Sequence, residues 1–304
     1  MQLRKNNTKW VFFLGVSNGH NPELRHILDL AYGIKCMESH GVQANDIEIY
    51  IDGIDRANIA KIIQTGTKNN YNIQYTQDFL NNTNSNTHEN SVVFISGHGS
   101  HLGIDASITV TPSTLIRSLK NTPNLKKSIV FLGQCYAGTF NYMPARKSSQ
   151  NDADVILIGA TDLHSSLSSH TNEIFLNNQT LSWIANVFLL FVFKWLEKPV
   201  DIDGDGKYTI MDCYKYAGCM ANNFNKANRS YSFEYSIEAR DKYKQKKIEY
   251  ENSRLATPPD IVKETIKALE LRQAKDDYTR SCDIYHTHQE CWILNSVPAQ
   301  IIEY

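Results

Sequence analysis

The chain has 304 residues, 31 basic and 32 acidic side chains, and a formal net charge of -1. This length can bury a sizeable core, as one large α/β domain with an appendage or as two domains. The balanced charge argues against a broad nucleic-acid-binding face. Six cysteines are too few for a disulfide scaffold, which favours reduced thiols.

Two apolar segments resemble targeting or membrane elements. Residues 1–16 have a basic start and end in the apolar stretch Trp10–Val16, but residues 18–21 offer no small-residue cleavage site, so we expect a first core strand. The run Val187–Phe193, within Leu181–Leu196, is shorter than the roughly 20 residues that a bilayer needs, which predicts a buried helix. We therefore expect no membrane span, and a protein that is cytoplasmic or exported without a cleavable signal peptide.

Short apolar segments alternate with helix-like segments over the first 160 residues. The expected strands, rich in β-branched and aromatic residues, are Trp10–Val16, Ile47–Ile51, Val92–Ser96, Ile129–Gly133 and Val155–Gly159. The expected helices are Pro22–Ser39, Asp55–Thr65 and Thr111–Leu119, the last with Thr111 as N-cap. This alternation implies crossover connections and therefore a mostly parallel sheet flanked by helices.

The character of the chain changes beyond about residue 222. Tyr231–Asn252 is highly charged and predicted to be helical, Pro258-Pro259 interrupts it, and Asp260–Asp277 is a second helix candidate. We therefore expect an α/β domain over residues 1–222 and a charged, mainly helical extension over residues 223–304.

Two of the expected strands end in a thiol and in an imidazole. Cys135 and His98 each follow a buried strand, so both belong at the carboxyl edge of the sheet, where open α/β folds bind ligands. A nearby imidazolium lowers the pKa of a thiol and creates a nucleophile. The backbone N–H groups of Cys135 and Gly99 are natural donors to an oxyanion. His98 is the preferred base because neither His20 nor His101 is followed by glycine.

The pattern His98-Gly99 followed by Cys135-Tyr-Ala-Gly138 resembles the caspase–legumain group of cysteine peptidases, with a similar layout from about Trp10 to Gly218. The resemblance implies a caspase-like sandwich of mostly parallel sheet between helices. It also implies that peptide bonds of a protein or peptide substrate are hydrolysed through a Cys-His dyad and an acyl-enzyme. Two alternatives stay open: a transamidase or ligase on the same dyad, and an inactive scaffold that binds a partner protein.

The residues around the expected substrate pocket depart from that group. Members commonly carry a polar or acidic residue two places before the nucleophile, where this chain has Gly133, and a small residue where it has Gln134. The residue preference at the cut is therefore not carried over. The resemblance implies that the loop after Val155–Gly159 helps to form the pocket, which makes Asp162 and His164 further candidates.

Residues 201–212 fit the twelve-residue EF-hand calcium loop. The expected ligands are Asp201, Asp203, Asp205, Lys207 through its carbonyl, Thr209 and Asp212. Asp212 stands where a bidentate Glu is usual, which predicts weaker binding. The alternative is an acidic turn without metal, and the ion's role, structural or regulatory, is left open.

A further group of metal-binding residue types lies near the C-terminal end. Cys282, His286, His288 and Cys291 fall within ten residues, but their spacing does not match the common zinc arrangements. We therefore expect no zinc there, but two ordinary thiols, or a disulfide in an oxidising setting.

Overall fold

The computed structural model describes residues 2–3, 7–81, 86–149, 152–286 and 290–304. The chain divides into two compact units, one made of Met1–Asn222 with Gln289–Tyr304 and the other of Asn223–His288. The expected division at residue 222 thus has a counterpart in the structure. The final segment differs from the expectation, because it returns to the first unit and does not belong to the helical extension.

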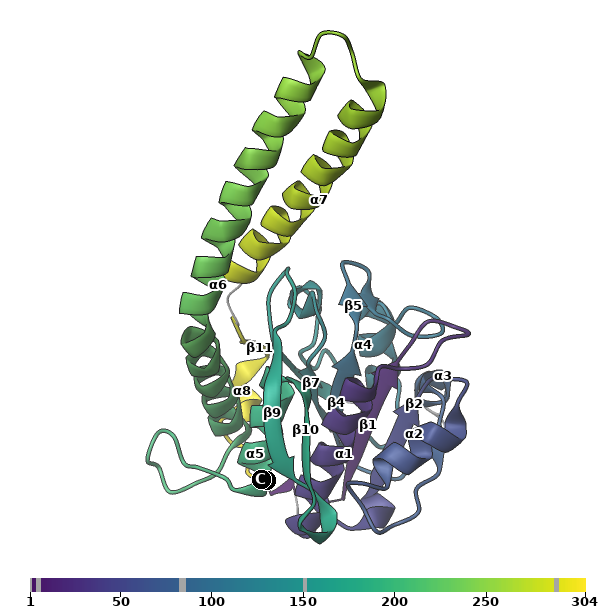
Figure 1. The fold of residues 1–304 in the computed structure, drawn as a ribbon. Helices are drawn as coiled ribbons and strands as arrows, with labels where there is room; N and C mark the ends of the chain where they lie inside the picture. Colours follow the sequence, from purple (N-terminus) through teal and green to yellow (C-terminus); the bar gives the residue numbers. More distant parts are fainter. Residues whose placement is uncertain (1, 4–6, 82–85, 150–151, 287–289) are drawn as a thin grey trace. The chain divides into compact units, whose positions relative to one another are not determined.

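A seven-stranded sheet forms the centre of the first unit, in the order β11-β8-β7-β4-β1-β2-β3 (Figure 1). Its strands are β1 Thr8–Gly15, β2 Ile47–Ile51, β3 Ile73–Gln74, β4 Asn90–Gly97, β7 Lys127–Leu132, β8 Asp154–Gly159 and β11 Trp292–Leu294. All neighbours pair in parallel except β11, which is antiparallel to β8. The expected mostly parallel sheet is confirmed, and the antiparallel edge strand was not predicted.

Helices cover both faces of this sheet. On one face lie α1 Leu24–Ser39, α2 Arg56–Ile63 and α5 Val187–Glu197, and on the other α3 Thr76–Asn81 and α4 Pro112–Lys120. Side chains alternate between the faces along each strand. Phe12, Phe94 and Phe131 are in register on β1, β4 and β7, with ring centroids 5.2 and 5.5 Å apart, and Phe193 of α5 packs against Phe94 at 5.0 Å. This aromatic row anchors α5 over the central strands.

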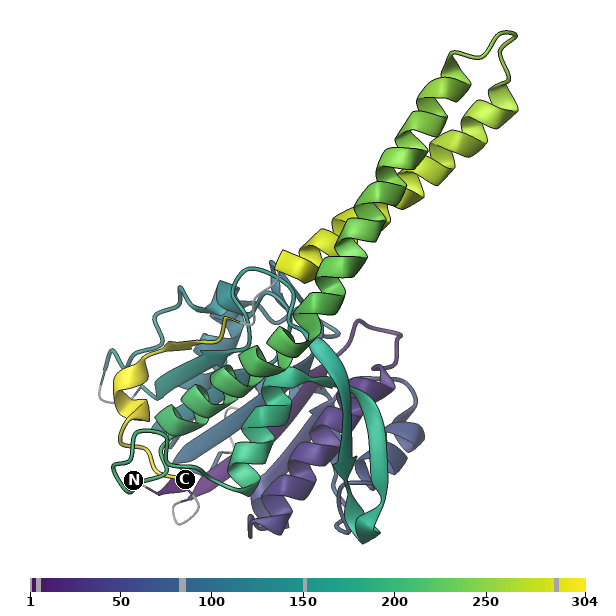
Figure 2. The same ribbon diagram turned by 60° about the vertical axis from the view of Figure 1, so that its left-hand side comes forward.

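One expected helix begins later than predicted. Residues 181–186 do not belong to it; they lie in β10 Thr180–Asn186, which pairs antiparallel with β9 Ser168–Ile174 as a hairpin beside α1 (Figure 2). The helix starts at Val187 because the Asn186 side chain caps it by accepting the Leu189 N–H. No helix within the described ranges is both long and apolar enough to cross a bilayer.

Short elements complete the first unit. They are the ribbon of β5 Gly99–Ser100 and β6 Gly103–Ile104, the helix α8 Ser296–Ala299, and the 3-10 turns at Ala44–Asp46, Ala137–Phe140 and Leu176–Asn178. Thr111 caps α4 by accepting the Thr114 N–H, as its sequence predicts. The long helix α6 Ile210–Arg254 contributes its first residues to this unit.

The second unit consists of the rest of α6 and of α7 Ile261–His286. Lys246 and Lys267 each pair with Glu249 and with Glu270, at 2.8 to 3.0 Å. The rings of Tyr243 and Tyr278 stack at 5.9 Å. Charged and aromatic contacts thus join the two helices, in agreement with the charged helical pair that the sequence predicts.

Candidate active site

The order of the strands creates a crevice at the carboxyl edge of the sheet. From β1 the chain moves outward through β2 and β3, then returns to β4 on the other side of β1 and continues to β7 and β8. The connections after β1 and β4 therefore diverge, and open α/β sheets bind ligands at such a switch point. A cavity of about 240 Å³ lies here, lined by the segment after β1, the start of α1 and His98.

The turns that carry the two predicted catalytic residues touch each other. His98 directly follows β4, after Gly97 with φ of +109°, a conformation that favours glycine. A Cβ added to Gly99 would lie 2.5 Å from the carbonyl oxygen of Cys135 and 2.5 Å from Cγ of Gln134. The two turns thus meet at Gly99, and only glycine permits this approach.

Cys135 opens a tight turn and is partly exposed. The next residue, Tyr136, has a left-handed φ of +56°, and the Cys135 sulfur accepts the N–H of Ser166 at 3.3 Å. Within the described residues the Cys135 N–H has no hydrogen-bond partner. The turn therefore presents a held sulfur beside a free backbone donor.

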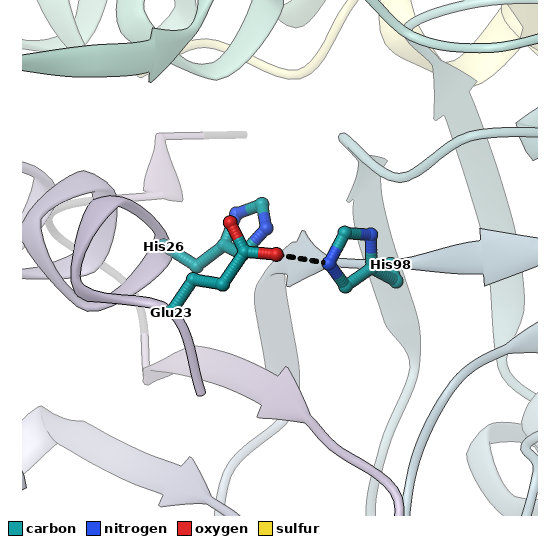
Figure 3. A group of neighbouring side chains, drawn as sticks. All are labelled: Glu23, His26 and His98. Atoms are coloured by element: carbon teal, nitrogen blue, oxygen red, sulfur yellow. Dashed lines mark hydrogen bonds and ion pairs between the residues drawn. The ribbon is translucent and has the colours of Figure 1, made fainter. Parts of the chain in front are cut away.

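Glu23 holds His98 from the side of β1. Its Oε1 lies 2.7 Å from Nε2 of His98, and both side chains are about half exposed (Figure 3). Hydrogen bonds from Arg25 and from His98 lower the pKa of Glu23 to about 2, so this carboxylate stays ionised near neutral pH. Because β4 lies between β1 and β7, His98 is placed between Glu23 and the Cys135 turn. No hydrogen bond joins His98 to Cys135 directly.

The buried carboxylate of Asp29 connects helix α1 to the elements that position Cys135. Asp29 on α1 is 3% exposed and accepts hydrogen bonds from the Trp183 indole at 2.8 Å and the Asn186 N–H at 3.2 Å. The Asn186 side chain in turn donates to the carbonyl of Gly133, two residues before Cys135. This network ties α1 and β10 to the strand that carries the thiol.

Glu23, His26 and Asp29 are not among the site residues predicted from the sequence. The available signal was their spacing: three polar residues, each three positions apart, at the start of a helix whose other positions are largely apolar. His26 and Asp29 are buried, and buried polar side chains need partners or a ligand, whereas Glu23 is half exposed.

The other predicted pocket residues surround the Cys135 turn. The carbonyls of Asp162 and His164 accept the N–H groups of Gly138 and Tyr136, at 3.2 and 2.8 Å, so the loop after β8 lies against the turn. Gly133 is buried, and a Cβ there would lie 2.6 Å from Cδ1 of Leu189 and 2.9 Å from the carbonyl oxygen of Ile95, so the close packing at this position favours glycine. Contact of these residues with a substrate stays a prediction.

Gln134 is the most unusual neighbour of the thiol. Its side chain is 1% exposed, and neither its amide nitrogen nor its amide oxygen has a partner among the described residues. Of the two competing histidines, His101 is exposed, and His20 lines the cavity after β1 while its Nδ1 contacts the Asn18 carbonyl at 3.1 Å. Neither histidine lies in the turn that contacts Cys135.

The acidic loop gathers three of its expected ligands. One oxygen from each of Asp201, Asp203 and Asp205 lies within 4.8 Å of the others. The backbone N–H of Gly206, and then that of Gly204, lower the pKa of Asp201. Asp212 is buried, and its oxygens accept from the Thr209 and Ile202 N–H groups inside the loop.

The two cysteines of the C-terminal group belong to different units, Cys282 to the second and Cys291 to the first. All six cysteines are free, and burial raises the pKa of Cys291 to about 12 while its sulfur contacts the Ala160 carbonyl at 3.5 Å. The His286 side chain and His288 lie outside the described residues. The structure holds Cys282 and Cys291 as free thiols, and a disulfide in an oxidising setting stays the alternative.

Comparisons with known proteins give a distant likeness of fold. No protein-family model and no curated protein matches the chain. Among solved structures it is similar to the crystal structure of caspase-1 from Spodoptera frugiperda, with 13% sequence identity and a TM-score of 0.42, over 71% of this chain and 79% of that chain. A likeness at this level assigns neither a family nor an activity to the chain.

Proposed function

We propose that the chain is a cysteine endopeptidase of the caspase–legumain type, with Cys135 as nucleophile and His98 as general base. The observation that supports it best is the contact between the His98-Gly99 turn and the Cys135 turn, with a carboxylate on the far side of the imidazole. A nucleophile, a base and a group that orients the base are the parts that covalent catalysis requires.

The proposed reaction uses the two nitrogens of His98 differently. Glu23 occupies Nε2, which leaves Nδ1 to exchange a proton with the Cys135 thiol. The thiolate attacks the peptide carbonyl carbon, and the N–H groups of Cys135 and Gly99 stabilise the oxyanion. His98 then gives its proton to the leaving amine, and it later takes one from the water that hydrolyses the thioester. General acid–base catalysis of this kind contributes about 10²- to 10⁴-fold in rate.

The test is labelling by an electrophilic peptide probe, followed by mass spectrometry of the modified residue. We expect the wild type to be labelled at Cys135, and Cys135→Ala and His98→Ala to lose labelling. Cys219→Ala, which removes an exposed thiol outside the site, serves as the matched control and should label like the wild type. Equal labelling of the wild type and Cys135→Ala would support the inactive scaffold instead. Products that incorporate an added amine would support the transamidase.

We propose in addition that the loop 201–212 binds calcium in a structural role. The convergence of the Asp201, Asp203 and Asp205 carboxylates supports this, because Lys215, whose Nζ lies 2.9 Å from Asp203, balances only one of three like charges within 4.8 Å. Both carboxylate oxygens of Asp212 already accept N–H groups of the loop backbone, which favours weak calcium binding.

A further inference from the structure

The cavity between β1 and β4 contains a second imidazole that the proposed peptide hydrolysis does not use. His26 lies on α1, is 4% exposed, and its ring meets that of His98 edge to face, with centroids 5.1 Å apart. One potential ligand atom from each of Glu23, His26 and His98 lies within 4.8 Å of the other two (Figure 3). Two imidazoles and a carboxylate thus converge on one point beside the cavity.

The two nitrogens of His26 have different surroundings. Nδ1 lies 3.4 Å from the Ser96 hydroxyl and 3.8 Å from the Asp29 carboxylate. Nε2 is buried and has no partner among the described residues. A buried polar atom without a partner is costly, and a metal-binding histidine usually has its other ring nitrogen hydrogen-bonded, as Nδ1 of His26 is to Ser96.

The kind of ligand follows from the donor atoms. Calcium and magnesium prefer oxygen ligands, whereas imidazole nitrogens with one carboxylate suit zinc and related transition metals. Three protein ligands also leave a coordination position open. We propose that Glu23, His26 and His98 form a binding site for a zinc-type divalent cation.

The consequence for activity rests on the proposed function of His98. An ion on Nε2 of His98 would replace the Glu23 hydrogen bond and hold the ring as a neutral ligand. The ring could then no longer become the imidazolium that stabilises the Cys135 thiolate. Zinc would therefore inhibit the peptidase reversibly, because it would bind the proposed base His98 in place of the Glu23 hydrogen bond.

Binding is tested on the full chain carrying Cys135→Ala, so that the thiol cannot hold the ion and catalysis is not needed. Zinc is titrated calorimetrically in excess calcium, which occupies the acidic loop. We expect one zinc site per chain, with affinity lowered about tenfold or more by His26→Gln and by Glu23→Gln. His101→Gln, an exposed histidine close to His98 in sequence, is the matched control and should bind like its parent.

Two results would overturn the site: no zinc binding by the Cys135→Ala chain, or parental affinity in both His26→Gln and Glu23→Gln. Glu23 is half exposed, so its variant reports on the site even if the buried His26→Gln does not fold. In the chain with its thiol, the zinc concentration for half-inhibition should rise in Glu23→Gln by the same factor as its dissociation constant. Inhibition unchanged in that variant would refute the regulatory role. Zinc binding by a chain without peptidase activity would keep the metal site and refute the proposed function.

Discussion

Replacement of Asp29 by alanine tests whether the buried network under the site holds the fold together. The substitution removes the acceptor of the Trp183 indole N–H and of the Asn186 N–H, and both donors are buried. The Ser96 hydroxyl, 3.3 Å from Asp29, keeps His26 Nδ1 as an alternative partner at 3.4 Å. Two donors are thus left unsatisfied, at about 1–3 kcal/mol each, which predicts a loss of about 4 kcal/mol in the free energy of unfolding.

The loss is measured by urea unfolding, followed by tryptophan fluorescence. All four tryptophans lie in the first unit, so the signal reports on that unit alone. Asp29→Asn keeps one acceptor oxygen and should lose about half as much as Asp29→Ala. Asp46→Ala is the control, because the pair of this partly exposed residue with His88 at 3.6 Å contributes only about 0–1 kcal/mol to the free energy of unfolding. A loss below about 1 kcal/mol in Asp29→Ala would refute the reasoning.

Three further predictions concern other parts of the molecule. Gln134→Met should raise the free energy of unfolding by about 1–3 kcal/mol in the same urea assay, because it removes a buried amide without partners; a loss of stability would contradict this. Calcium should raise the melting temperature in scanning calorimetry, and Asp201→Ala combined with Asp203→Ala should abolish the rise; an undiminished rise would exclude the acidic loop as the calcium site. Hydrogen bonds from Lys267, and then from Lys246, lower the pKa of Glu249 in the second unit to about 2. Since this folded-state value lies below the unfolded value of about 4.3, the pair stabilises the helices above that pH and should lose its effect as the pH falls towards 2. Circular dichroism between pH 5 and 2 should show this loss, and it should shrink at high salt because the Glu249 side chain is partly exposed; a profile independent of salt would argue against the ion pairs.

The central strands could be predicted because they are buried on both faces. Such strands are near-continuous apolar runs, and Val92–Ser96 and Ile129–Gly133 stand out from their polar surroundings. The strand β10 was missed because its sequence continues without a break into the apolar helix α5, and its change of structure depends on the cap at Asn186. The strand β11 was missed because its partner β8 is more than 130 residues away in the chain.

The candidate site was also predictable only in part, because some of its residues are brought in by pairing between strands that are distant in the sequence. His98 and Cys135 follow strong strand signals, so their place at the sheet edge could be inferred from local sequence. Glu23 and His26 contribute only because β4 pairs with β1 and not with β3, a choice of strand order that no local pattern specifies. The sequence therefore predicts the nucleophile and the base, whereas the topology adds the residues that hold the base.

The return of the chain to pair β11 with β8 also bears on solubility. Without this strand, β8 would offer an open row of backbone donors and acceptors to other molecules, and exposed edges of this kind promote aggregation. The Trp292 ring packs directly over Gly159, where an added Cβ would lie 2.2 Å from the ring. The pairing of β11 with β8 therefore depends on glycine at this position. A protease cut in the second unit, between α6 and α7, would leave β11 held to β8 only by noncovalent contacts, so we expect the cut protein to self-associate once β11 detaches.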